Sequence, residues 1–161
     1  MKKTLALLAA LLVAASSAAS VSAVEIISAG SGTTPLTYTV GSSYTVTIPE
    51  GITLAENIGT AESQVSATGV LLNEGKTLYV KISNAANKIE GKDFRLFTGD
   101  STYLDYTIQK KDNDTNLKIS DTVLEIPAGS TSGSIALDIA AATATIAGTY
   151  TDTLTFAVSV E

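Results

Sequence analysis

Apolar and polar side chains alternate along much of this chain, which is the period of a β-strand and not of a helix. The pattern is longest at the C-terminal end, where every second residue from Leu154 to Val160 is a large apolar one. Residues typical of turns interrupt the alternation at intervals of roughly 8–12 residues, so the pattern predicts about eight to ten short strands. We expect these strands at residues 36–40, 44–48, 65–72, 78–82, 94–96, 104–108, 124–126, 135–139 and 153–160.

The connections between these stretches indicate antiparallel neighbours. Asn73-Glu74-Gly75-Lys76 is a turn sequence, and it predicts a hairpin that joins residues 65–72 to residues 78–82. Parallel strands need crossover connections that are usually helical, and helical spacing is nearly absent from the chain. The Ala- and Thr-rich stretch 140–147 fits a loop, a short strand or a helical turn. The sequence therefore predicts an all-β fold, an antiparallel sandwich or barrel.

The first 23 residues have the order of a secretory signal peptide. Met1-Lys2-Lys3 is cationic, residues 5–15 are Leu, Ala and Val, and residues 16–23 are mostly small or polar. An uncleaved membrane anchor is the alternative, but the apolar run is shorter than the ~20 residues that cross a bilayer. We therefore expect cleavage after Ala23. Residues 1–23 would be the signal peptide, and residues 24–161 would form a single β-sandwich domain without membrane insertion.

Net charge and cysteine content limit the classes of binding partner and the cellular location that we expect. The formal net charge is −6, and removal of Lys2 and Lys3 with the leader makes it −8. Acidity of this size disfavours nucleic acid and anionic lipid as partners. Secretion permits disulfides, but the chain has no Cys, so its apolar core must hold the fold alone. We expect an extracellular or cell-surface protein, or a periplasmic one if the source is Gram-negative.

The absence of both His and Cys removes most catalytic arrangements. Ser-His-Asp and Cys-His nucleophilic sites are excluded, and so are the usual ligands of zinc and copper. Asp105 and Glu125 are the carboxylates that a glycosidase would use, but strand parity places them outward as isolated surface charges. No motif supports a Ser-Lys pair that uses Lys110 or Lys111. We therefore predict that the protein is not an enzyme, and we assign no catalytic, cofactor-binding or metal-binding residue.

The acidic segment Asp112–Asn116 has the spacing of the first three ligands in an EF-hand loop. The sixth position of that loop requires Gly and here is Leu117, and the twelfth requires Glu and here is Val123. The flanking residues also predict strands and not helices. We interpret the segment as a hairpin turn, and we leave open a different calcium geometry that includes Asp100 or Asp121.

Two contact surfaces remain as candidates. Tyr79, Phe97 and Tyr103 face outward by strand parity and would be platforms for a sugar, although aromatic residues on sheets are commonly cross-strand pairs. The stretch Val24–Ser28 is β-prone and is followed by Ala29-Gly30-Ser31-Gly32. It would add to a neighbour's sheet edge and build a fibre, or it would pair as the first strand of its own domain.

The segment Ala147–Phe156, with the sequence AGTYTDTLTF, resembles the last strand of secreted pilin-like sandwiches, in particular spore coat protein U-type domains. The same spacing is similar to the tyrosine corner of immunoglobulin-like sandwiches, in which Tyr150 would bond to upstream backbone and Gly148 would make a tight turn. The chain lacks the Cys pair that is common in those domains. It also has Val160 where chaperone-assembled pilins usually carry Tyr.

The resemblance implies an antiparallel immunoglobulin-like or pilin-like β-sandwich from a bacterium. Together with the leader it predicts a secreted structural or adhesive protein of the cell surface or extracellular matrix. Such a protein would act through non-covalent sheet or loop contacts, with a second copy or another surface protein as partner. The alternative is an extracellular carbohydrate-binding module with a polysaccharide partner, and a carboxylate-based hydrolase ranks last.

Overall fold

A computed structural model describes residues 36–54, 59–99 and 101–161. The predicted signal peptide, the stretch Val24–Ser28 and Asp100 lie outside the described residues. The described residues form nine strands and no helix, and therefore no helix long and apolar enough to span a membrane. The strands are β1 (Ser43–Thr47), β2 (Thr60–Leu71), β3 (Thr77–Ala85), β4 (Arg95–Phe97), β5 (Tyr103–Lys110), β6 (Thr115–Asn116), β7 (Thr122–Pro127), β8 (Ser132–Ala141) and β9 (Leu154–Val160).

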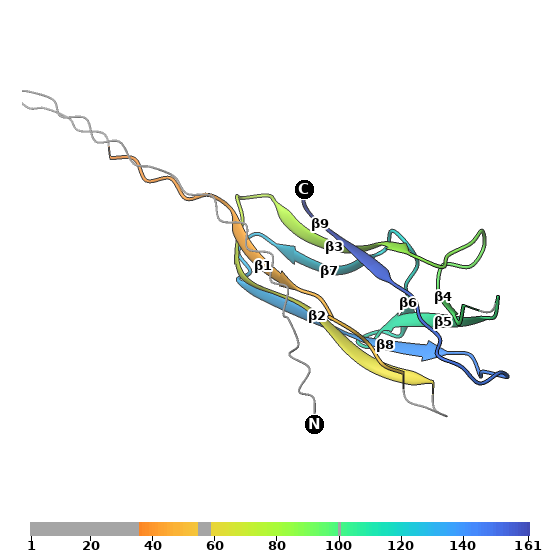
Figure 1. The fold of residues 1–161 in the computed structure, drawn as a ribbon. Coiled ribbons are helices and arrows are strands. Elements are labelled where there is room, and N and C mark those ends of the chain that lie inside the picture. Colours follow the sequence, from red (N-terminus) through yellow and green to blue (C-terminus); the bar gives the residue numbers. More distant parts are fainter. Residues whose placement is uncertain (1–35, 55–58, 100) are drawn as a thin grey trace, which may run out of the picture.

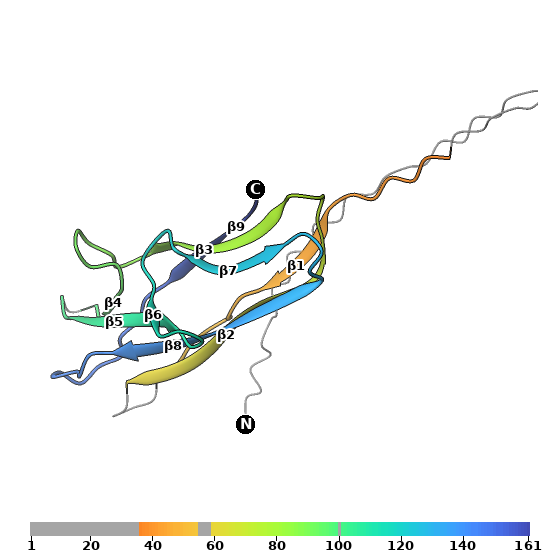
Figure 2. The same ribbon diagram turned by 180° about the vertical axis from the view of Figure 1, so that it is seen from behind.

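The strands form two facing sheets, and every strand pair is antiparallel (Figure 1). One sheet has the order β1-β2-β8-β5-β4, with β6 paired to β5, and the other has the order β7-β3-β9. The predicted all-β antiparallel sandwich is confirmed. Figure 2 shows the same two layers from behind, with β7 on the near side of its sheet.

The alternation correctly identified the inward face of most strands. On β3, the central strand of the smaller sheet, Leu78, Val80 and Ile82 have no exposed surface at all. On β8, Leu137 and Ile139 are buried in the same way, as predicted. Burying an apolar side chain of this size contributes about 1.5–3 kcal/mol, so these stripes hold the two sheets together. The buried core consists of Val65, Ala67, Val70, Leu78, Val80, Ile82, Ala85, Phe94, Tyr106, Ile108, Leu117, Val123, Leu124, Ile126, Leu137 and Ile139.

Two sequence predictions about strand pairing are wrong. Residues 73–76 do form a turn, in which the Lys76 amide bonds to the Asn73 carbonyl, but β2 and β3 belong to different sheets. A turn signal is local and does not report which strands pair, and here both edges of β3 are occupied by β7 and β9. The predicted strand at residues 36–40 is also absent. Strand β1 starts at Ser43, which pairs with Leu71 at the very end of β2, so earlier residues have no β2 partner.

A bulge in β2 was not visible in the alternation. Ser43 pairs with Leu71 and Thr45 pairs with Thr68, so β2 carries one extra residue in this interval. Gly69 supplies it, with a φ of 60° in the left-handed region that glycine adopts at little cost. The extra residue shifts the inward face of β2 from odd to even positions, which explains why Val70 is buried and Leu71 is exposed.

Candidate functional site

The two carboxylates considered for hydrolysis do not form a pair. Asp105 lies on β5 and Glu125 on β7, which belong to different sheets, and both side chains are exposed. Asp105 is not the isolated charge that parity predicted, because it forms ion pairs with Lys92 and Arg95. A cleft of about 370 Å³ includes Asp105 and Lys92, but their charges are already matched to each other. The two carboxyl groups therefore cannot flank one glycosidic bond as general acid and general base.

Lys111, which was considered for a Ser-Lys catalytic pair, interacts instead with two acidic side chains. Its amine forms a hydrogen bond and ion pair with Glu62 and lies 4.0 Å from Asp138. The hydrogen bond and charge of Glu62 raise the pKa of Lys111. A general base needs a lowered lysine pKa, so this environment is opposite to that of a Ser-Lys catalytic pair.

The acidic segment Asp112–Asn116 is a hairpin turn, as the sequence predicted. It joins β5 to β6, and Asn113 Oδ1 accepts a hydrogen bond of 3.1 Å from the Thr115 amide. Asp121, the other loop acid considered, accepts a hydrogen bond from the Lys118 amide within its own turn. Among residues 36–54, 59–99 and 101–161, no three acidic side chains converge on a metal-sized site.

Each outward aromatic ring contacts a neighbouring side chain, although Tyr103 remains 44% exposed. Tyr103 stacks on Phe97 with ring centroids 4.8 Å apart, and the Arg95 guanidinium lies 3.7 Å from the Tyr103 ring centroid. Lys81 lies 5.2 Å from the ring centroid of Tyr79. These contacts are cross-strand and cation–π pairs that stabilise a sheet surface. They leave few free ring faces on which a sugar would stack.

The tyrosine hydroxyl singled out in the sequence does bond to upstream backbone. Tyr150 Oη donates a hydrogen bond of 2.9 Å to the Ile146 carbonyl, within the connection between β8 and β9. Gly148 lies in the same connection but outside the left-handed φ region. A Cβ at Gly148 would lie 3.4 Å from Thr98 Cγ2, which is an ordinary van der Waals contact, so neither turn geometry nor packing requires glycine there.

One side of the sandwich is bounded by two edge strands, and we call it the open side. Strand β1 is the edge of the larger sheet and β9 is an edge of the smaller sheet. Both lie toward the viewer in Figure 1 and away from the viewer in Figure 2. Two apolar side chains at these edges are partly exposed: Ile48, just after β1, is 42% exposed, and Val158 on β9, which pairs with the buried Val80, is 38% exposed. Apolar surface is therefore open to solvent at both edges of this side.

Strand β9 lacks the features that usually protect a sheet edge. Its seven residues include no charge, no Pro and no Gly. Natural edge strands commonly carry such residues, since an unpaired row of backbone groups otherwise pairs with another strand. The alternation of Leu154, Phe156, Val158 and Val160 gives β9 an apolar inward face, which a pairing strand of the same pattern would extend.

The start of β9 is held by one carboxylate. Asp152 Oδ2 accepts a hydrogen bond of 2.7 Å from the Tyr106 hydroxyl. Asp152 Oδ1 accepts hydrogen bonds from the amides of Asn87, at 3.1 Å, and Thr153, at 2.8 Å. Burial of the Tyr106 ring, together with the hydrogen bond to Asp152 and its charge, raises the pKa of the hydroxyl well above its ordinary value. From the sequence, Asp152 was included only as part of the segment 147–156 and was assigned no role, because two of its three donors are 46 and 65 residues away.

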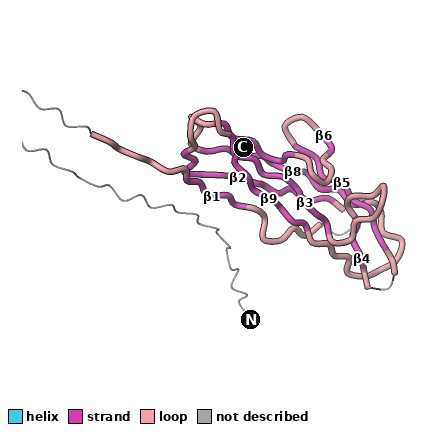
Figure 3. Tube along the Cα trace, turned by 90° about the horizontal axis from the view of Figure 1, so that it is seen from above, coloured by secondary structure: helices cyan, strands magenta, loops and turns pink. Residues whose placement is uncertain are grey.

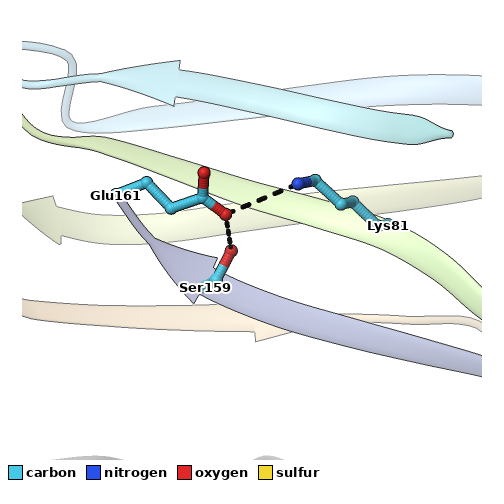
Figure 4. Close-up of polar contacts among 3 residues, drawn as sticks. All are labelled: Lys81, Ser159 and Glu161. Carbon is cyan, nitrogen blue, oxygen red and sulfur yellow. Dashed lines mark hydrogen bonds and ion pairs between the residues drawn. The ribbon is translucent and has the colours of Figure 1, made fainter. Parts of the chain in front are cut away.

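The other end of β9 is held by Glu161 (Figure 4). The backbone of Glu161 exchanges two hydrogen bonds with Thr77, each 3.0 Å long. Its carboxylate accepts a hydrogen bond of 3.0 Å from Ser159 Oγ and lies 3.4 Å from Lys81 Nζ. The Ser159 hydrogen bond and the Lys81 charge lower the pKa of Glu161. Both ends of the edge strand are therefore anchored to β3 or to the opposite sheet.

The residues before β1 form an apolar stripe without a core to cover. Leu36 is 97% exposed, Tyr38 is 89% exposed and Val40 is 44% exposed. Figure 3 shows this segment leaving the sandwich at the start of β1. The alternation in residues 36–40 has the period of a strand, but this segment is not part of either sheet.

No protein-family model and no curated protein sequence matches the chain. Among solved structures, it is similar to a chain of the CsuC–CsuE chaperone–tip adhesion subunit pre-assembly complex of Acinetobacter baumannii Csu pili. The sequence identity is 21% and the TM-score is 0.55, over 74% of this chain and 40% of that chain. A chain of a chaperone–tip adhesin complex of CFA/I fimbriae biogenesis is similar at 16% identity and TM-score 0.47, over 72% of this chain and 42% of that chain.

The chain thus spans less than half the length of either solved chain. The similarity to the chain of the Csu pilus complex shows the fold, an immunoglobulin-like sandwich of the kind found in pilus proteins.

Proposed function

We propose that the protein is a structural or adhesive subunit of a bacterial surface or extracellular matrix, which associates by adding a strand to β9 on its open side. The observation that carries this proposal is the uncharged edge of β9, beside which the inward-pointing Val158 is 38% exposed. The similarity to a chain of a pilus assembly complex supports the same role. The predicted leader would export the chain to the compartment where such a role is performed.

The partner that we propose is a second copy of this chain, which supplies its residues 36–40. Leu36, Tyr38 and Val40 present the alternation that pairing with β9 requires, and the segment carries no charge. It leaves its own sandwich at the start of β1 (Figure 3), so it is placed to contact a neighbour. Backbone hydrogen bonds would supply affinity, and burial of the apolar stripe would select the register.

This donor differs from the one that the sequence suggested, which was Val24–Ser28. That stretch lies outside the described residues, and its pairing stays a prediction. Residues 36–40 are favoured because they lie within the described residues and their apolar side chains are exposed. The described surface offers no specific support for the carbohydrate-binding alternative, since the rings of Tyr103 and Tyr79 already contact Arg95 and Lys81.

Sedimentation velocity of the chain that begins at Val24 tests the proposal. We expect concentration-dependent association that Val158→Lys abolishes, because the new charge would lie at the apolar seam. Thr155→Lys is the matched control, since Thr155 is exposed on the opposite face of the same strand. On the donor side, Leu36→Asp should weaken association, and Thr37→Asp, off the stripe, should have little effect.

The outcomes separate the two parts of the proposal. A strict monomer at high concentration would contradict self-association altogether. Association that survives Val158→Lys would exclude the β9 edge. If Val158→Lys prevents association and Leu36→Asp does not, the edge is correct and the strand is supplied by another segment or protein.

A further inference from the structure

Strand β9 is an edge strand that pairs with only one neighbour, so contacts at its two ends are important for keeping it ordered. Along its length it is hydrogen-bonded to β3 and to no other described strand. A strand that is held on one edge loses its order from its termini more readily than a central strand does. A strand that accepts a partner strand binds more tightly if it is already ordered. If it is not, part of the binding free energy is spent on ordering it.

Asp152 lies two residues before β9 and joins three segments at this point. Its donors are Tyr106 on β5 in the opposite sheet, the Asn87 amide in the turn after β3, and the adjacent Thr153 amide. The preceding residue, Thr151, exchanges two backbone hydrogen bonds of 2.8 and 2.9 Å with Phe97. The carboxylate therefore fixes the place where the chain crosses from one sheet to the other.

The Asn87 side chain also holds this connection, with a hydrogen bond of 2.9 Å from its Nδ2 to the Thr151 carbonyl, but that bond supplies no acceptor for the Tyr106 hydroxyl. Removing the carboxylate leaves the Tyr106 hydroxyl and the Asn87 amide without their acceptor in a part-buried region. Unsatisfied donors in a part-buried region cost free energy, and this cost falls when the start of β9 moves away and water reaches them. The paired conformation of β9 therefore becomes less populated. The apparent affinity for an added strand falls in proportion to the population that remains competent.

We propose that Asp152 is a positioning residue for strand addition, which keeps β9 in the conformation that accepts a partner strand. This inference rests on the proposed function, because it concerns the same edge. It assigns a role in assembly to a residue that does not lie on the assembly surface. Asp152 acts through the order of β9 and makes no contact with the added strand.

The test is the affinity of the chain that begins at Val24 for a fluorescein-labelled synthetic peptide of residues 35–42, measured by fluorescence anisotropy. Asp152→Ala should weaken binding on the order of tenfold. Asp93→Ala is the matched control, because Asp93 also accepts a backbone hydrogen bond, from Ile119, but lies away from β9. It should leave the affinity within about twofold of wild type.

Two further measurements keep the proposal testable if Asp152→Ala does not fold. Tyr106→Phe removes one of the three hydrogen bonds and no atom of the β9 connection, and it should weaken peptide binding by roughly threefold to tenfold. Hydrogen exchange of the amides of Thr153 and Leu154 should accelerate in that variant, while the Val80 amide on the central strand should not change. A purely structural role would lower the melting temperature without this change in affinity.

The possible results distinguish this inference from the function on which it rests. If the wild-type chain does not bind the peptide, the donor assignment fails and this inference fails with it. If wild type binds and Asp152→Ala and Tyr106→Phe bind equally well, the proposed function stands and the positioning role is overturned. Equal weakening by Asp93→Ala would also overturn it, because the effect would then follow from lost stability in general.

Discussion

The phenolic hydroxyl of Tyr106 lies 2.7 Å from Oδ2 of Asp152, and this contact joins β5 of one sheet to the connection that leads into β9 of the other. The two residues are 46 positions apart, so only the folded chain brings them together. Tyr106 is 8% exposed, and its ring packs against Phe94 at a centroid distance of 5.4 Å. The hydrogen bond thus anchors an edge strand to the apolar core.

Tyr106 makes the stability of the protein sensitive to alkaline pH. Burial and Asp152 raise the pKa of its hydroxyl in the folded state, whereas in the unfolded chain it titrates near pH 10. The stabilising contribution is therefore complete below about pH 10 and is lost as the pH rises beyond it. Urea unfolding between pH 7 and pH 11 should show a steeper decline for wild type than for Tyr106→Phe. Parallel curves would contradict the assignment.

The hydrogen bond of Tyr150 should contribute to the free energy of unfolding about as much as one neutral hydrogen bond usually does. Its hydroxyl donates to the Ile146 carbonyl at 2.9 Å. We expect Tyr150→Phe to lower the free energy of unfolding by about 0.5–1.5 kcal/mol, with an unchanged denaturant slope. Tyr38→Phe is the control, because Tyr38 is 89% exposed and should be neutral. Equal effects of the two substitutions would exclude a role for the Tyr150 bond.

Gly133 on β8 faces the core and has no room for a side chain. A Cβ at this position would lie 2.9 Å from Cδ1 and 3.0 Å from Cγ1 of Ile126, which is itself 2% exposed. Overpacking should make Gly133→Ala destabilising by about 1–3 kcal/mol. Gly51→Ala is the control, since a Cβ at Gly51 would meet nothing within 4 Å beyond its chain neighbours and the φ there is ordinary. Thermal unfolding of both variants would reveal the difference, and a neutral Gly133→Ala would show that Ile126 moves aside.

Substitution of Leu36 and of Leu137 should have different effects on self-association and on the free energy of unfolding. Leu137 is 2% exposed, so Leu137→Ala should cost about 2–5 kcal/mol of unfolding free energy. Leu36 is 97% exposed, so Leu36→Ala should stay within about 0.5 kcal/mol of wild type. If residues 36–40 supply the added strand, Leu36→Ala should still weaken self-association. Loss of stability in Leu36→Ala would instead indicate that this side chain covers its own domain.

The sequence predicted most of the strands but not their partners. The stripe of Leu78, Val80 and Ile82 is fully buried, as its alternation required. The hairpin predicted across residues 73–76 does not exist, because the flanking strands lie in different sheets. Alternation records which face of a strand is apolar, and it contains no information on which neighbour covers that face.

The candidate site was predicted even less completely. Edge-strand pairing was expected from Val24–Ser28, whereas the exposed stripe that the structure describes is at residues 36–40. Asp152 lies within the segment 147–156 that carried the resemblance to pilin-like sandwiches, but nothing in that segment indicated its hydrogen-bond partners. Its importance arises from Tyr106 and Asn87, which the fold alone brings to its carboxylate.

The sequence by itself determined the class of structure: the period of two identified the inward faces of most strands, and the lack of His and Cys limited the chemistry. Only the tertiary structure decided that β1 and β9 are edges of the two sheets and that Ile48 and Val158 are exposed at those edges. The physical reason is that periodicity is a local property of neighbouring residues. Sheet order depends on contacts between distant segments, and those contacts also decide which apolar side chains stay exposed.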